Sequence, residues 1–308
     1  MAVVVAARRR RISTQMRKEA IAFYLFVTPW ILGLIIFTAG PMIASFVISL
    51  TRWSIMSPPQ WLWFNNYMTA VHDPLFWKSL RVTMTYSVAS VPLTLALGLF
   101  VAVLMNQKIP AMNVFRTIYY MPSVVSGVAV AILWTLVFNS QWGVLNTILL
   151  RVLHIKGPAW LLSETWVLPA FIVMSMWSIG GGMIIYLAGL QSVPTELYEA
   201  AQLDGANRLE KFRYVAIPWI SPVIFFNLVM GIIGSFQVFT SSYVMTQGGP
   251  NNASLFYLLY LYNNAWKYFK MGYASALAWI AFAITMAFTL AVIRSSSAWV
   301  YYEGVRRR

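Results

Sequence analysis

The sequence of 308 residues contains no cysteine and few charged residues. The absence of cysteine excludes disulfide bonds and thiolate metal sites. Charged residues make up 10% of the chain, whereas a soluble domain carries about a quarter. The phosphate-binding pattern G-x-x-x-x-G-K-[ST] does not occur, so the sequence offers no visible site for ATP. These absences disfavour a soluble enzyme, and we expect no cofactor to bind to this chain.

Hydrophobic residues make up 60% of the sequence and are gathered in long runs. Runs that can cross a hydrocarbon core of roughly 30 Å predict a membrane-spanning helix each. Pro29 and Gly33 predict a kink or a tilt in the first of them. No charge lies in the core of any run, whereas ion-coupled carriers commonly keep a carboxylate there. We predict six spans, at 20–50, 81–105, 118–138, 166–190, 222–245 and 272–293.

The lysine and arginine residues predict the orientation of the chain. With the N-terminus inside, fifteen of them fall in inner segments and seven in outer segments. The positive-inside rule therefore predicts a multi-pass inner-membrane protein with both termini in the cytoplasm. The net charge of +14 indicates this topology and attraction to anionic membrane lipid, and nucleic acid is the weaker interpretation. The expected parts are a basic arm (1–19), a membrane domain (20–293) and a basic tail (294–308).

The segment 191–221 is a polar cytoplasmic loop between two apolar runs. It holds four of the eight acidic residues, Glu196, Glu199, Asp204 and Glu210. A membrane protein that concentrates carboxylates in one loop is expected to present them to a partner. Because the spans contain no coupling carboxylate, energy would reach this chain from another protein through this loop.

Local signals in the loop predict two short helices joined at an angle. Ser192 is expected to cap the first helix, and Gly205 to end it in the left-handed conformation. Asn207 and Glu210 have the spacing of a capping box for the second helix. That helix is expected to stop before Pro218.

The loop also carries a specific motif, formed by Glu199, Ala200, Ala201, Asp204, Gly205 and Pro218. With this spacing it resembles the EAA loop of permease subunits in ATP-binding-cassette (ABC) importers, the inner-membrane components of binding-protein-dependent transport systems. Other segments are similar to the carbohydrate-uptake branch of that family, namely Thr28-Pro-Trp30, Phe37-Thr-Ala-Gly-Pro41, Asp73-Pro-Leu-Phe-Trp77, Phe115-Arg-Thr-Ile-Tyr-Tyr-Met-Pro122, Thr246-Gln-Gly-Gly-Pro250 and Met271-Gly-Tyr-Ala-Ser-Ala-Leu-Ala278.

The resemblance implies an all-α membrane protein with the type I importer (MetI-like) fold. It implies that Glu199 contacts an ATP-hydrolysing subunit and that Gly205 forms the bend. The chain would be a translocation subunit and not itself an enzyme. The implied partners are a second permease, two ATPase subunits that hold ATP and Mg, and an extracytoplasmic solute-binding protein.

Neutral polar side chains beside aromatic rings suit a sugar, whose hydroxyls and C–H faces they match. The resemblance places solute contacts in the helices just before and just after the loop. The candidates for the solute path are Gln237, Ser235, Trp177, Ser178 and Ser175. Hydrogen bonding between helices is the alternative role for each of them.

The expected function is import of a sugar or oligosaccharide by alternating access. The same machine could carry a glycerol phosphate, an amino acid or a peptide. From other classes, an ion-coupled secondary carrier and a non-transporting membrane assembly factor are the alternatives.

Overall fold

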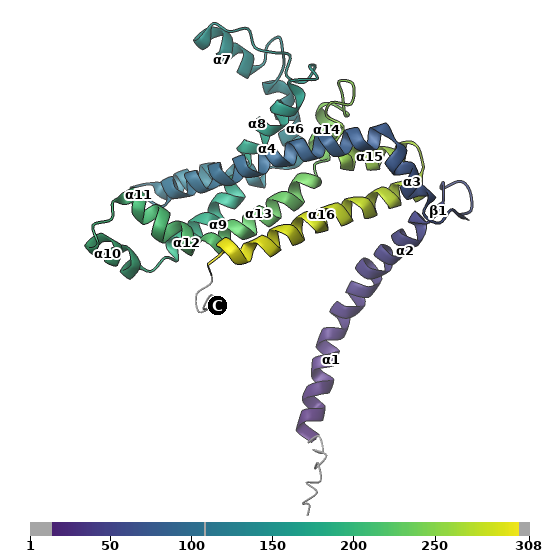
Figure 1. Ribbon diagram of the computed structural model, residues 1–308, viewed down its shortest axis with the longest axis horizontal. Coiled ribbons are helices and arrows are strands. Elements are labelled where there is room, and N and C mark those ends of the chain that lie inside the picture. Colours follow the sequence, from purple (N-terminus) through teal and green to yellow (C-terminus); the bar gives the residue numbers. More distant parts are fainter. Residues whose placement is uncertain (1–13, 108, 302–308) are drawn as a thin grey trace, which may run out of the picture.

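The computed structural model describes residues 14–107 and 109–301, which are predominantly helical (Figure 1). The only strands among these residues are β1 (Thr51–Arg52) and β2 (Gln60–Trp61), an antiparallel pair that joins Arg52 to Gln60. The first half of the chain contains α1 (Thr14–Leu34), η1 (Ile35–Ala39), α2 (Gly40–Ser49), α3 (Asn65–His72), α4 (Pro74–Met105), α5 (Met112–Tyr120), η2 (Met121–Val124), α6 (Gly127–Val137) and α7 (Val144–Leu153). The second half contains α8 (Val167–Trp177), α9 (Gly180–Gln191), α10 (Thr195–Leu203), α11 (Arg208–Lys211), η3 (Phe212–Ala216), α12 (Ile217–Trp219), α13 (Ser221–Phe236), α14 (Thr240–Met245), α15 (Tyr257–Tyr262), η4 (Asn263–Lys267) and α16 (Met271–Trp299).

Four helical segments in the described residues are long and apolar enough to cross a membrane, and two bent helix pairs bring the number to six if each pair is one span. The four are Thr14–Ser49, Pro74–Met105, Ser221–Met245 and Met271–Trp299. The first carries the π-helical segment η1, which begins two residues after Gly33; the predicted kink or tilt stays a prediction.

The predicted spans 118–138 and 166–190 are wrong as continuous helices. The first bends by 99° between η2 and α6, and the second by 45° between α8 and α9. Ser126 caps the new start of α6, where its Oγ accepts a hydrogen bond from the N–H of Ala129 at 3.4 Å. At the second break the backbones meet closely, because a Cβ on Gly180 would lie 2.3 Å from the carbonyl oxygen of Tyr119. The apolar composition of the sequence does not reveal tertiary packing of this kind, so it could not predict the two breaks.

The body is built around α4, which lies beside α13 and α9, while α16 packs on α13 (Figure 1). One buried cluster joins α4, α9 and the segment 212–220. A second joins α4, α6 and α8, and a third lies where α3, α15 and α16 meet. Helix α1, by contrast, has no buried residue and runs away from the body.

The two ends of the body carry different elements. Helices α10 and α11 lie at one end of α4, and α3 and β1 lie at the other (Figure 1). Helix α1 begins at Thr14, inside the predicted basic arm, and α16 ends at Trp299, inside the predicted basic tail. Residues 1–13 of that arm and 302–308 of that tail lie outside the described residues.

Candidate functional site

Helix α10 and the turn that ends it form the first half of a protruding unit, here called the knob (residues 192–219). Gly205 adopts a φ of +82°, as predicted for the bend. The N–H of Ala206 donates to the carbonyl of Ala201 at 2.9 Å, and the N–H of Gly205 donates to that of Gln202 at 3.1 Å. This pair of bonds is the Schellman pattern, which satisfies the last carbonyls of the helix.

The second half begins with the predicted capping box. The Oδ1 of Asn207 accepts hydrogen bonds from the N–H groups of Leu209 and Glu210, at 2.9 and 3.0 Å. The Oε2 of Glu210 accepts one from the N–H of Asn207 at 2.7 Å. The Nζ of Lys211 then donates to the Oε1 of Gln202 at 3.0 Å, which ties the two helices together.

Two predictions about this unit are wrong. Ser192 does not cap α10, whose N-cap is Pro194. Its hydroxyl instead donates to the carbonyl of Gly189 at 2.8 Å, at the end of α9. The second helix also does not stop before Pro218, because the π-helical η3 precedes α12 and the helical path runs through to Trp219. The π register allows this, since it relieves the clash that proline makes with the carbonyl four residues earlier.

The inner side of the knob is part of the hydrophobic core. Ala216 of the knob and Ile220, which directly follows the knob, are buried in the cluster that contains residues of α4 and α9. Tyr198 of α10 packs against the same cluster, and burial raises the pKa of its phenol, which therefore stays neutral. The knob is thus continuous with the close packing of α4 and α9.

The last described residues also hold the knob. The N–H of Tyr301 donates to the Oγ of Ser221 at 2.8 Å, and the ring of Tyr301 lies 6.4 Å from that of Trp219. The neighbouring Val300 is buried. The end of α16 is therefore fastened directly to the base of the knob.

The outer side of the knob is an open surface. Glu199, Ala200, Asp204 and Gly205 are exposed, and Ala201 is half-buried. Two large apolar side chains also lie on this surface: Leu203 is 90% exposed and Leu209 is 73% exposed. The sequence analysis did not predict either of them. Two such leucines on either side of a tight turn are typical of a surface that another protein covers. Their position beside the predicted left-handed glycine was the available signal.

The candidate path residues divide into two groups. Trp177 and Ser178 lie at the break between α8 and α9, and Gln237 at the break between α13 and α14, with Ser178 and Gln237 exposed. A Cβ on Gly127, at the start of α6, would lie 3.8 Å from the Cγ2 of Thr240, so the breaks before α6 and before α14 adjoin. Interrupted helices free backbone groups, and membrane proteins place them where they line a cavity or are buried in protein.

Ser235 and Ser175 are engaged within the chain instead. The Oγ of Ser235 lies 2.6 Å from the Oγ of Ser87 on α4 and is buried. The Oγ of Ser175 donates to the carbonyl of Ile172 at 2.6 Å. Sequence reasoning missed Trp134, whose ring lies 6.1 Å from that of Trp177 and whose buried Nε1–H has no hydrogen-bond partner in the described residues.

This arrangement, with a protruding two-helix knob fused to a bundle of interrupted apolar helices, agrees with comparisons to known proteins. The family described as "Binding-protein-dependent transport system inner membrane component" matches residues 94–302. The chain belongs to this family. The match includes the knob, the interrupted helices α8, α9, α13 and α14, and all of α16, and it marks the chain as a multi-pass membrane protein.

The relatives of this inner-membrane component include sugar permeases. A probable ABC transporter permease protein, YesP of Bacillus subtilis (strain 168), is 41% identical over 95% of this chain and 96% of its own length. The arabinooligosaccharides transport system permease protein AraP of the same strain is 30% identical over 89% of this chain and 88% of its own. The same fold occurs in a crystal structure of a bacterial alginate ABC transporter in complex with a periplasmic protein that carries an alginate pentasaccharide. A chain of that structure matches with a TM-score of 0.81 and 23% identity, over 92% of this chain and 96% of its own length.

Proposed function

We propose that this inner-membrane component is the translocation subunit of an ATP-driven importer for a sugar or oligosaccharide. The observation that carries the proposal is the knob, which is exposed on one side and part of the core of α4, α9 and the segment 212–220 on the other. Such a unit can receive a movement made by another protein and pass it to membrane helices. In this proposal six spans cross the membrane, each bent pair counts as one span, and both termini and the knob face the cytoplasm.

The proposed partner of the knob is an ATPase subunit that binds ATP and Mg. Glu199 offers two acceptor oxygens to an arginine of this partner, and Leu203 and Leu209 fill an apolar cleft in it. A second permease, two copies of the ATPase and an extracytoplasmic solute-binding protein complete the assembly. The named partners of similar proteins support this assembly, since the alginate transporter was crystallised with a periplasmic protein.

The sugar cargo is supported by the names of relatives and by the chemistry of the helix breaks. Gln237, Ser178 and the indoles of Trp177 and Trp134 lie at or beside the breaks. The free Nε1–H of Trp134 would donate to a solute hydroxyl once the helices part. Ser235 and Ser175 fit a supporting role better, because their hydroxyls bind other parts of the chain.

The test is ATP hydrolysis by the assembled complex in lipid vesicles. Adding solute-loaded binding protein should raise the ATPase rate, because a ligand that favours one of two states shifts their populations. An oligosaccharide cargo should be taken up only with ATP present. A rate unchanged by loaded binding protein, in vesicles that transport, would contradict the proposal, and uptake by the permease without ATPase subunits would favour a secondary carrier.

A further inference from the structure

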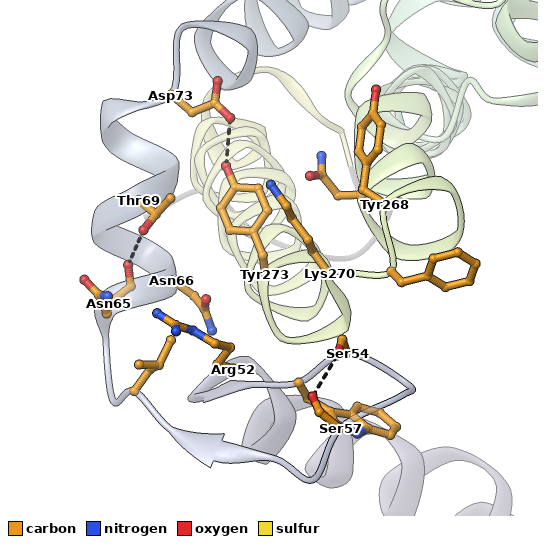
Figure 2. Close-up of a pocket in the computed structure, with 14 residues that line it drawn as sticks. Arg52, Ser54, Ser57, Asn65, Asn66, Thr69, Asp73, Tyr268, Lys270 and Tyr273 are labelled. Carbon is orange, nitrogen blue, oxygen red and sulfur yellow. Dashed lines mark hydrogen bonds between the residues drawn. The ribbon is translucent and has the colours of Figure 1, made fainter.

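A cavity of about 450 Å³ lies at the end of the molecule opposite the knob, between the β1–β2 hairpin, α3 and the start of α16 (Figure 2). This volume is within the range of small-molecule sites, roughly 300–1,000 Å³. None of the candidate coupling or path residues lines it. Its lining includes amide, hydroxyl and cationic groups, contributed by Asn65, Thr69, Ser54, Ser57, Arg52 and Lys270.

The lining of this cavity contains two cationic side chains and one carboxylate. Arg52 comes from the hairpin and Lys270 from the residue before α16, and both line the cavity. Neither side chain makes an ion pair or a hydrogen bond to another residue in 14–107 or 109–301. The two cations are therefore left for a ligand.

The carboxylate of the cavity, Asp73, is already used by the fold. Its Oδ1 accepts a hydrogen bond from the N–H of Leu75 at 2.8 Å. Its Oδ2 accepts hydrogen bonds from the hydroxyls of Tyr260 and Tyr273, the latter at 3.3 Å. Burial raises the pKa of the Tyr260 phenol most, and the hydrogen bond to Asp73 raises it further. The phenol therefore stays protonated and donates its hydrogen bond to Asp73. Asp73 is thus occupied, and the cavity presents a net positive charge.

The walls that carry the two cations are held in place. The Nδ2 of Asn66 donates to the carbonyls of Ser49 and Thr51, at 2.7 and 2.8 Å, which fixes the hairpin on α3. The N–H of Gly272 donates to the carbonyl of Trp53 at 3.3 Å. A Cβ on Gly272 would lie 1.9 Å from the carbonyl oxygen of Thr51, so glycine permits this contact. The site is preorganised, which lowers the cost of binding.

Aromatic side chains place this cavity at the membrane surface. Trp61, Trp63 and Phe64 are 59%, 69% and 64% exposed on the hairpin and just before α3. Tryptophan prefers the level of the lipid headgroups. Exposed apolar side chains of α2, such as Ile43 at 66%, continue from there toward the membrane interior. A ligand in the cavity would have its polar part among the cations and an apolar surface beside it.

We propose that this cavity binds the headgroup of an anionic phospholipid. The phosphodiester would bind between Arg52 and Lys270, since guanidinium and ammonium groups are strong phosphate partners. Headgroup hydroxyls would bind the Asn65 amide and the hydroxyl of Thr69 or Ser57. The acyl chains would lie along α2. The inference requires only that the chain is embedded in a membrane, and it goes beyond the transport function.

The test is native mass spectrometry of the delipidated, assembled transporter, titrated with palmitoyl-oleoyl-phosphatidylglycerol. The R52Q/K270Q variant should bind this lipid about 25-fold more weakly at the site, because each cation near a membrane surface contributes about a fivefold effect. The matched control is R151Q/K156Q, which removes two cations that do not line the cavity, one in α7 and one just after it. It should change the affinity less than about twofold. R52K/K270R should retain binding.

Equal lipid affinity in R52Q/K270Q and R151Q/K156Q would overturn the proposal. Glycerol-1-phosphate tests the source of the anion, and if it binds as tightly as the lipid, the site takes a soluble anion and the lipid assignment is wrong. A second measurement uses the wild-type complex with a photoreactive phosphatidylglycerol. Crosslinks to the peptides that contain 52–73 and 264–273 are expected, and crosslinks elsewhere alone would also overturn it.

Discussion

Glu199 is a residue whose surroundings define its role. It is exposed on α10 and binds no other side chain in residues 14–107 and 109–301. Glu210, by contrast, is used by the capping box of α11. Glu199 is therefore free to bind a cation on another protein.

Replacing Glu199 with lysine should weaken assembly with the ATPase subunits by about tenfold or more, since the change removes one member of a charge pair and adds a repulsive charge. Membrane insertion should be unaffected. Co-purification of the ATPase with the permease measures the effect. Glu164→Lys, at an exposed position shortly before α8, makes the same change of charge and should leave assembly intact. Wild-type assembly and transport in Glu199→Lys would remove the assigned role.

Gly272 is needed for a close contact. Because a Cβ there would lie 1.9 Å from the carbonyl oxygen of Thr51, Gly272→Val must push α16 away from the hairpin. Overpacking of this kind costs about 1–3 kcal/mol. The unfolding temperature of the purified complex should fall in this variant. Gly33→Ala is the control, because a Cβ on Gly33 meets nothing within 4 Å. An unchanged unfolding temperature in Gly272→Val would show that the hairpin gives way at no cost.

At the scale of helices, the link between α16 and the knob is short and specific. It consists of the contact between the rings of Tyr301 and Trp219 and one hydrogen bond from Tyr301 to Ser221, next to the buried Val300. Helix α16, which is long and apolar enough to cross a membrane, is thus tied to the knob, which receives the movement in the proposed function.

Tyr301→Ala should loosen this link. Loss of the ring contact should speed hydrogen exchange of the amides in 212–221 about fivefold, which corresponds to a local opening about 1 kcal/mol easier. Hydrogen exchange of the assembled complex, read by mass spectrometry, measures it. Ser297→Ala, at an exposed position of the same helix, should leave the exchange unchanged. If both variants exchange at the wild-type rate, α16 is not held through Tyr301.

Features fixed by local chemistry could be predicted from the sequence. The bend at Gly205 and the capping box of Asn207 and Glu210 depend on residues within a few positions. Ser192 was assigned to the wrong helix because its hydroxyl also accepts from the Nε1–H of Trp219, which lies 27 positions away. The helix break at Gly180 depends on Tyr119, and the apolar composition on both sides of the break is the same.

The cavity between Arg52 and Lys270 could not be predicted from the sequence either, because it also depends on contacts between residues far apart in the chain. Its walls come from 52–73 and 264–273, which are brought together by Asp73 and two tyrosines about 190 and 200 positions away. The motif around Glu199 predicted a coupling loop, but it did not predict that Leu203 and Leu209 would be exposed beside it.

At the scale of the whole molecule, the helices α10 and α11 of the knob lie at one end of α4, and α3 and β1, whose residues line the cavity, lie at the other (Figure 1). Helix α4 spans 32 residues and is apolar enough to cross a membrane. The two ends should therefore lie on opposite sides of it. The positive-inside rule assigns the knob to the cytoplasm and the hairpin to the outside.

The absence of cysteine makes this orientation directly measurable. Leu203→Cys on the knob and Met56→Cys on the hairpin are matched, because the native side chains are 90% and 89% exposed. In intact cells an impermeant maleimide should label Met56→Cys and leave Leu203→Cys unlabelled until the membrane is permeabilised. Co-expressed ATPase subunits should then protect Leu203→Cys alone, because they would cover the knob. Labelling of Leu203→Cys from outside would invert the topology, and with the knob outside the cell, a cytoplasmic ATPase could not drive these helices.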